Sequence, residues 1–161
     1  MSSNKKGTLT YTYYPSGKVE TIDSSNPNGS SNPNGISVAY AYDDLNRLST
    51  LTDNRLQGNQ TTTYTYDPAS NVATVHAPNG LSSTFTYDAL NRLTAMNAGA
   101  ATYSYQLGAT GNRTGSTEGN GRSLAWNYDG IYRLTNETIS DDPADNNGSA
   151  SYNLDPVGNR S

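Results

Sequence analysis

The chain has 161 residues, enough for one domain, and a net charge of −4 from ten basic and fourteen acidic side chains. This acidic balance argues against nucleic acid or an anionic membrane surface as the main partner. The sequence has no cysteine, which excludes disulfides and cysteine-ligated metals, and no apolar run of about 18 residues that would predict a membrane-spanning helix.

Tyrosine supplies most of the large apolar surface of this chain. Hydrophobic residues make up 32% of the sequence, and they include thirteen tyrosines but only one tryptophan and one phenylalanine. A buried tyrosine needs a partner for its hydroxyl, and Thr and Tyr favour strands whereas Asn and Gly favour turns. The composition therefore predicts strands and turns, with a partly solvated sheet face in place of a hydrophobic core.

The first residues, Met1 to Gly7, are polar and have no apolar segment behind their two lysines. They lack the pattern of a signal peptide, so if the protein is exported, its signal is expected outside this chain. We expect a flexible N-terminus over residues 1–7 and repeats over residues 8–161, in a single array that makes up one domain, 1–161.

One pattern recurs along the rest of the chain: Tyr-x-Tyr-Asp, a few turn residues, then a basic or amide residue and an aliphatic one. About seven copies are present at variable spacing, which indicates a unit with tolerant loops. Alternating residues before the aspartate, as in Thr61 to Tyr66, predict a strand, so each copy is predicted to be a β-hairpin. In chain order the copies occupy residues 11–19, 40–48, 64–72, 85–93, 103–113, 126–134 and 152–160.

The turn of each hairpin is predicted to be a type I turn followed by a left-handed residue, with the aspartate accepting a backbone hydrogen bond. Two copies depart from the Gly or Asn that this position favours, and they put the turn geometry of Ser70 and Tyr132 in doubt. The fifth copy has extra residues between Tyr105 and Gly111 and should have a wider turn. The left-handed positions are Gly17, Asn46, Ser70, Asn91, Gly111, Tyr132 and Gly158.

This turn fixes a register for the second copy. Asp43 is expected opposite Arg47, Tyr42 opposite Leu48, and Tyr40 opposite Thr50, which gives one Tyr/Leu face and an Asp–Arg pair near each turn. Because a lone hairpin is marginal in water, the array is the expected folding unit. The residues expected to carry the repeat structurally are Tyr40, Tyr42, Asp43, Arg47, Leu48, Tyr64, Tyr66, Asp67, Tyr87, Asp88, Arg92, Leu93, Trp126, Tyr128, Asp129, Arg133 and Leu134.

A second set of turns should connect the hairpins into a meander. Asn-Gly dipeptides, which favour tight turns, occur at residues 28–29, 34–35, 79–80 and 147–148. The first two lie in a duplicated Ser-Asn-Pro-Asn-Gly segment, which we interpret as a lengthened, solvent-exposed connection.

Tyr-Asp followed by Asn-Arg-Leu resembles the YD repeat of RHS proteins, which also occurs in the C component of Tc toxins and in teneurins. The resemblance covers about residues 8–161 and implies an all-β strip of tandem antiparallel hairpins, twisted and spiralling into a shell. In bacterial members the shell encloses a toxin, which implies a secreted or cell-surface protein with a toxin cargo as partner. The family also has a C-terminal aspartyl self-cleavage region, but Asp155-Pro156 sits where other copies have their turn, as Asp67-Pro68 does, so we expect a turn there.

Two alternative functions are compatible with the same residues. Both chain ends are expected to be open sheet edges that pair with further YD repeats of the same or another copy, so an extracellular self-assembling filament or adhesin is one alternative. The tyrosine ladder could also stack on sugars, which makes carbohydrate binding a less favoured one.

An enzyme is not expected. His76 is the only histidine and lacks the partners of a triad or a zinc site. The pairs Asp43-Asp44 and Asp141-Asp142 are interpreted as turn and loop residues, and the acidic loop from Asp141 to Gly148 lacks the alternating carboxylates of a calcium loop. The sequence therefore predicts no catalytic residue, no cofactor and no metal.

Overall fold

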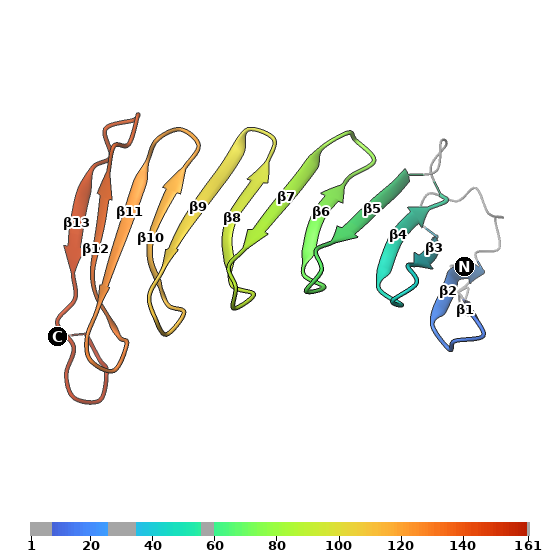
Figure 1. Cartoon of the computed structure of the whole chain (residues 1–161), viewed down its shortest axis with the longest axis horizontal. Coiled ribbons are helices and arrows are strands. Elements are labelled where there is room, and N and C mark those ends of the chain that lie inside the picture. The colour runs from blue at the N-terminus through green and yellow to red at the C-terminus, as the bar shows by residue number, and fades with distance from the viewer. Residues whose placement is uncertain (1–7, 26–34, 56–59, 161) are drawn as a thin grey trace, which may run out of the picture. The chain divides into compact units, whose positions relative to one another are not determined.

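The computed structural model describes residues 8–25, 35–55 and 60–160, and every regular element within them is a β-strand (Figure 1). The strands lie in the sheet in chain order and pair antiparallel where their registers are defined, which confirms the predicted all-β hairpin fold. The predictions for residues 1–7, for the turn at Asn28-Gly29 and for the turn at Asn34-Gly35, of which only Gly35 is described, lie outside the described residues. The strands are β1 (Thr8–Tyr13), β2 (Val19–Ser25), β3 (Ser37–Tyr42), β4 (Leu48–Asp53), β5 (Gln60–Tyr66), β6 (Val72–His76), β7 (Ser82–Tyr87), β8 (Leu93–Ala98), β9 (Ala101–Leu107), β10 (Arg113–Glu118), β11 (Ser123–Tyr128), β12 (Leu134–Ser140) and β13 (Gly148–Ser151).

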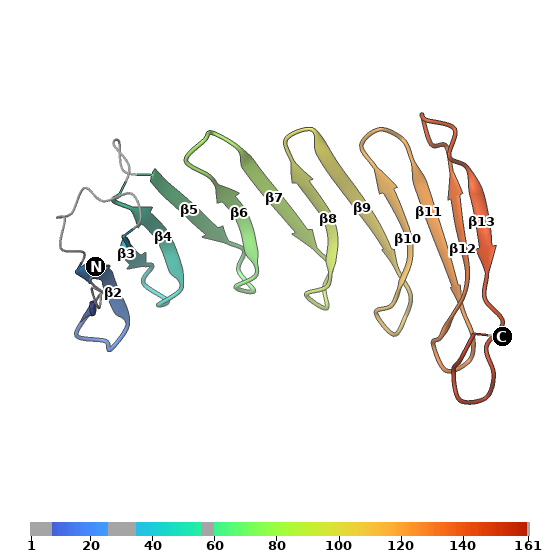
Figure 2. The same ribbon diagram turned by 180° about the vertical axis from the view of Figure 1, so that it is seen from behind.

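The chain divides into two compact units, one formed by residues 1–67 and 74–82 and the other by residues 68–73 and 83–161. Within each unit the chain meanders, and its turns alternate between the two ends of the strands (Figures 1 and 2). The turns that contain the Tyr-Asp copies lie at one end, and the connections between copies lie at the other. We call the strand before a Tyr-Asp turn the outgoing strand and the strand after it the returning strand.

The described residues of the two units form no hydrophobic core. No hydrophobic side chain in the described part of the chain is buried, and the one buried polar side chain there is Ser116, which is 5% exposed. Most strand residues are half-buried, as expected for a single sheet whose side chains cover one another along each face. Stability must therefore come from the backbone ladder and from many cross-strand contacts of about 0.2–1 kcal/mol each.

The two faces of the sheet differ in chemistry, because successive strand residues point to opposite sides. One face carries the aromatic residues and their aliphatic partners, such as Tyr87 opposite Leu93 and Phe85 opposite Met96. The other face carries small hydroxyl side chains that bond across the strands, as Thr12 does with Thr21 at 2.8 Å.

The predicted register is correct next to the turn and wrong beyond it. Tyr42 pairs with Leu48 as expected, but Tyr40 pairs with Leu51 and not with Thr50. The cause is a β-bulge: Ser49 is an extra residue on β4, so that Ala41 pairs with Thr50. The same shift occurs after the turn in each of the other hairpins whose register is defined.

Of the predicted connecting turns in the described part of the chain, one agrees with the structure and one differs. A turn forms at Asn79-Gly80, with the Gly80 amide donating to the Ala77 carbonyl at 3.0 Å. The tight turn predicted at Asn147-Gly148 is wrong, because Gly148 begins β13 and the turn lies earlier, where the Asp145 amide donates to Asp142 at 2.9 Å. The Asn147 side-chain oxygen instead accepts from the Asp142 amide at 3.0 Å.

Candidate functional site

The recurring feature of the molecule is the five-residue turn after each outgoing strand, which we call the corner. In the corner of β3–β4, the Asp43 amide donates to the Arg47 carbonyl and the Asn46 amide donates to the Asp43 carbonyl, both at 2.8 Å. One carboxylate oxygen of Asp43 accepts from the amides of Leu45 at 3.0 Å and Arg47 at 2.8 Å. The other accepts from the Arg47 side chain at 2.7 Å, so a single side chain holds the whole turn.

Three further corners repeat this geometry. The side-chain Nε of Arg92 donates to Asp88, and that of Arg133 donates to Asp129, each at 2.6 Å. In the last corner, the Asn159 side chain donates to Asp155 at 3.0 Å. Asp155 thus makes the bonds of a turn aspartate, as the sequence predicted for Asp155-Pro156.

These bonds favour the ionised carboxylates. The pKa values of Asp43, Asp88 and Asp129 are lowered, first by the backbone N–H of the arginine in the same corner and also by its guanidinium. The pKa of Asp155 is lowered chiefly by the Asn159 side chain. A carboxylate fixed in this way is a structural acceptor and is poorly suited to take up a proton in catalysis.

All seven predicted left-handed residues have positive φ, from 60° at Asn91 to 96° at Gly158. Ser70, with a φ of 69°, and Tyr132, with a φ of 63°, adopt it as well, so the doubt about their two turns is resolved in favour of the common geometry. The turn is imposed by its hydrogen bonds, which outweigh the local preference for Gly or Asn.

The wider turn predicted in the fifth copy is wrong. Its corner runs from Gly108 to Asn112 with the usual two bonds, the Gly108 amide to the Asn112 carbonyl at 2.8 Å and the Gly111 amide to the Gly108 carbonyl at 3.0 Å. Leu107, not Tyr105, therefore occupies the place of the second tyrosine and pairs with Arg113. The extra residues lengthen β9 and leave the turn unchanged.

Tyrosine hydroxyls join consecutive hairpins, which the sequence did not predict. The second tyrosine of a copy donates to the carbonyl of the first residue on the preceding returning strand. The pairs are Tyr42 to Val19 at 3.1 Å, Tyr66 to Leu48 at 2.8 Å, Tyr87 to Val72 at 3.0 Å and Tyr128 to Arg113 at 2.6 Å. Each ring thus covers the apolar face while its hydroxyl caps the neighbouring strand.

Arginine forms a second link, in the forward direction. Arg92 donates to the carbonyl of Gly108 at 3.0 Å, and Arg133 donates to the carbonyl of Asp155 at 2.8 Å. In both cases the acceptor is the first residue of the next corner. The guanidinium of Arg47 also lies 4.4 Å from the ring centroid of Tyr66 in the next copy, a cation–π contact.

The corners alternate along the chain between two types. Arginine corners, which carry an arginine at the fifth position, occupy residues 43–47, 88–92 and 129–133, and corners without it occupy residues 14–18, 67–71, 108–112 and 155–159. Two of the non-arginine corners also have leucine before them, at Leu107 and Leu154, and arginine after them, at Arg113 and Arg160. The guanidinium groups of these arginines lie 4.3 Å and 4.0 Å from the ring centroids of Tyr105 and Tyr152. In these two hairpins an Arg–Tyr contact therefore replaces the Tyr–Leu pair that lies next to other corners.

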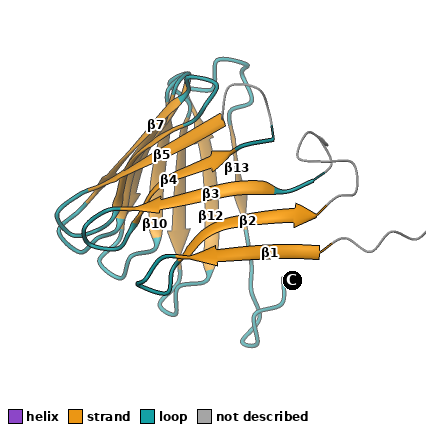
Figure 3. Cartoon of the chain, turned by 90° about the vertical axis from the view of Figure 1, so that its right-hand side faces the viewer, coloured by secondary structure: helices purple, strands orange, loops and turns teal. Residues whose placement is uncertain are grey.

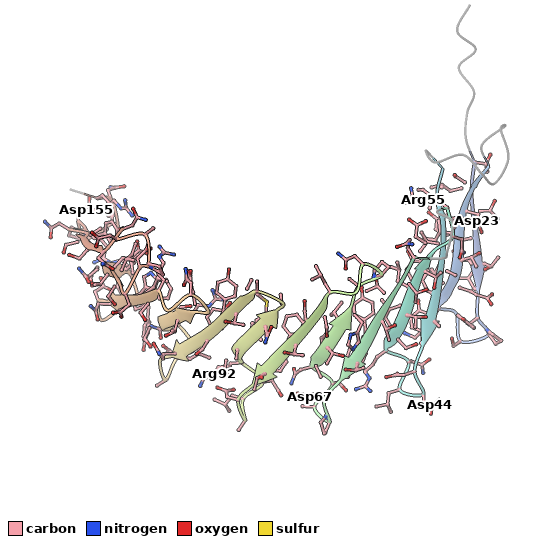
Figure 4. All side chains as sticks on the ribbon, turned by 90° about the horizontal axis from the view of Figure 1, so that it is seen from above. Asp23, Asp44, Arg55, Asp67, Arg92 and Asp155 are labelled. Atoms are coloured by element: carbon pink, nitrogen blue, oxygen red, sulfur yellow. The ribbon has the colours of Figure 1, made fainter. Side chains whose placement is uncertain are left out.

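The remaining predicted residues lie along the same hairpins. Trp126 pairs with Glu137, and its indole N–H donates to that carboxylate at 2.7 Å. Glu137 thus takes the place of the apolar partner that the first aromatic residue has in other hairpins. Tyr64 lies on β5, half-buried. Asp67 begins its corner, and Figure 4 places it at the turn end of the strands, as it does Asp44 and Arg92.

The other chemical candidates do not form a site. His76 is exposed at the end of β6, and Asp142 faces Arg122 at 3.3 Å. No group of three or more metal-ligating side chains occurs within the ranges that the structure describes. A hollow of ≈ 330 Å³ lies beside Thr86, Asn97 and Thr102. Among the described residues, no helix has the length and apolar character to cross a membrane.

Comparisons with known proteins agree with this repeat geometry. Residues 71–103 match the family model of the RHS repeat, and no curated protein matches the chain. The solved complex TcdB2-TccC3-Cdc42 is similar in fold, with a TM-score of 0.71 and 16% identity over 95% of this chain. TcdB2-TccC3 without its hypervariable C-terminal region gives a TM-score of 0.59 with 14% identity over 98%. The Tc holotoxin pore of Photorhabdus luminescens gives 0.55 with 16% identity over 96%. The chain spans 9% to 10% of the length of these structures' chains.

Proposed function

The chain carries an RHS repeat and has the fold seen in Tc toxin structures, and we propose that it is a structural segment of a β-sheet wall that encloses or scaffolds a toxin or other cargo. The observation that carries this proposal is the set of links between consecutive hairpins, made by a tyrosine hydroxyl at some junctions and by a corner arginine at others. Such links extend a sheet sideways without a core, which is what a thin wall requires.

The wall function gives the repeat residues a structural role. The aspartates hold the corners, the arginines and tyrosines join one hairpin to the next, and no catalytic step is assigned to them. We propose one array of hairpins over residues 8–161, in a protein that acts outside the bacterial cell or on its surface. Its partners are further YD repeats and an enclosed cargo, with no cofactor. The comparisons give no support to a filament or adhesin, or to carbohydrate binding.

The test is to purify the protein together with the coding sequence on both sides of this segment and to image it by cryo-electron microscopy. We expect a hollow particle with this segment in its wall, and cargo sequence that resists protease until the wall is unfolded. A filament, or a solid particle whose cargo sequence is cut at once by protease, would rule the wall function out.

A further inference from the structure

The outer side of β1 has strand-pairing groups that no described strand uses. Within the described part of the chain β2 is the sole neighbour of β1, and Figure 3 shows β1 as the outermost strand beside β2 and β3. The Tyr14 amide points to its own hairpin, where it donates to the Lys18 carbonyl at 2.9 Å. By the two-residue alternation of a strand, the backbone groups of Tyr13, Tyr11 and Leu9 face outward.

The side chains of this edge are also left uncovered. Leu9 is 48% exposed, Tyr11 44% and Tyr13 57%. The rings of Tyr11 and Tyr13 stack on each other at 6.5 Å. An edge strand with this much apolar surface and free backbone is a template for a further strand.

Two groups at the first hairpin's turn end lack partners that equivalent groups in other copies have. The hydroxyls of Tyr42 and Tyr66 donate to a preceding returning strand, whereas no described residue accepts from the Tyr13 hydroxyl. The Tyr14 carbonyl accepts the turn bond from Gly17 at 2.8 Å, and no second donor reaches it within the described ranges. A carbonyl oxygen has two lone pairs, so the second one is available.

The equivalents of the Tyr14 carbonyl show which donor fits. The carbonyl of Gly108 accepts its turn bond and also Arg92, and the carbonyl of Asp155 accepts its turn bond and also Arg133. Both begin non-arginine corners, and both donors come from the arginine corner before them. The corner of residues 14–18 also lacks arginine, although it carries Lys18 at the fifth position where the other two carry asparagine. The alternation of the corners therefore places an arginine corner before it.

We propose that the outer side of β1 binds the returning strand of an arginine-bearing YD hairpin that lies outside this chain. The arginine of that hairpin donates to the Tyr14 carbonyl, and its first returning-strand carbonyl accepts the Tyr13 hydroxyl. The strand pairs antiparallel with β1, which is β-strand addition with a defined donor. This deepens the proposed wall function by naming the partner of one edge.

A folded second copy of this chain does not supply that strand. The returning strands of its arginine corners are β4, β8 and β12. Each already pairs on both sides, β4 with β3 and β5, β8 with β7 and β9, and β12 with β11 and β13. The partner is therefore a hairpin of another YD segment.

The test adds such a hairpin to the full chain. A copy of residues 82–101, which contains the arginine corner of β7–β8, replaces residues 1–7 directly before Thr8, so that the copied β8 meets β1 as β8 meets β9. Amide hydrogen exchange is measured at Leu9, Tyr11 and Tyr13. We expect exchange at these amides to slow by about tenfold or more relative to the unmodified chain.

Two matched controls test the role of arginine. In the first, Arg92→Gln is introduced in the copied hairpin only. In the second, a copy of residues 101–122, whose corner lacks arginine, replaces residues 1–7. Both should protect the β1 amides several-fold less than the arginine hairpin does. Unchanged exchange in β11–β12 shows that each variant is folded.

Three outcomes would overturn the proposal: edge amides as fast as in the unmodified chain, equal protection by the hairpin without arginine, or a dimer of the unmodified chain with its β1 amides already protected. The last would identify a second copy as the partner. None of these results bears on whether the wall is hollow, so failure here is distinguishable from failure of the proposed function.

Discussion

At the scale of single residues, the corner requires a left-handed residue, and Tyr132 fills that position at a cost. Its φ is 63°, and its side chain is 58% exposed, so little packing compensates for the strain. Asn tolerates this conformation far better than a bulky side chain. We predict that Tyr132→Asn raises the free energy of unfolding by about 1 kcal/mol, measured by urea denaturation with Trp126 fluorescence.

Ile131→Asn is the matched control, because it introduces the same residue at the neighbouring exposed position, which has no positive φ. Its effect should stay within about 0.5 kcal/mol. If Tyr132→Asn is neutral or destabilising, the exposed ring makes a contribution that exceeds the backbone strain.

At the scale of the hairpin, the tyrosine hydroxyls should contribute measurably to the contact between neighbours. Tyr42→Phe removes the bond to the Val19 carbonyl and keeps the ring, leaving a half-buried carbonyl with one partner fewer. We predict a loss of about 1 kcal/mol in the free energy of unfolding, followed by far-ultraviolet circular dichroism, with faster amide exchange between β2 and β3.

Tyr13→Phe serves as the comparison, since it changes the same atom at the equivalent position of a hairpin whose hydroxyl has no acceptor among the described residues. It should be nearly neutral in this chain. Equal losses in the two variants would mean that the hydroxyl acts through hydration or ring packing and not through the inter-hairpin bond.

The hairpin is also the scale at which sequence reasoning succeeds and then fails. The Asp43 turn and the pair Tyr42–Leu48 follow from local turn chemistry, which needs only neighbouring residues, and both are found. The pairing of Tyr40 was missed because the bulge at Ser49 lies beyond the turn. A signal was present: a hydroxyl residue recurs at the bulge, and Thr94 and Thr135 use theirs to bond the opposite strand, each at 3.1 Å.

The links between hairpins could not be derived from any one copy. The bond from Arg92 to Gly108 depends on the register between two copies, which local patterns do not encode. The alternation of arginine and non-arginine corners was visible in the sequence and would have indicated that the repeating unit is a pair of hairpins. Arg113 and Arg160, which occupy the aliphatic position, were the further sign of that alternation.

At the scale of the whole molecule, the absence of buried hydrophobic side chains among the described residues leaves the repeated corners as a distributed source of stability. Each corner contributes a similar small term, as in other repeat proteins. A condition that weakens every corner together should therefore unfold the chain more effectively than any single substitution.

Acid is such a condition, because the pKa values of Asp43, Asp88, Asp129 and Asp155 are all lowered, and Arg55 lowers the pKa of Asp53 to about 2. A carboxyl whose pKa is lower in the folded than in the unfolded chain stabilises the fold above its ordinary value of 3.8, and this stabilisation is lost as the pH falls through the folded value. We predict a urea midpoint that is level from about pH 7 to pH 5 and declines below about pH 4.

The decline should persist in about 0.5 M salt, since the leading cause at Asp43, Asp88 and Asp129 is a backbone hydrogen bond, which salt screens far less than exposed charge pairs. Asp43→Asn should be less stable at neutral pH and lose a smaller amount on acidification. Asp44→Asn, the control, removes an equal charge from the exposed neighbouring residue and should leave the acid response near that of the unmodified chain. A midpoint that holds steady down to pH 2, or an equal response in both variants, would mean that the corner carboxylates do not hold the sheet together.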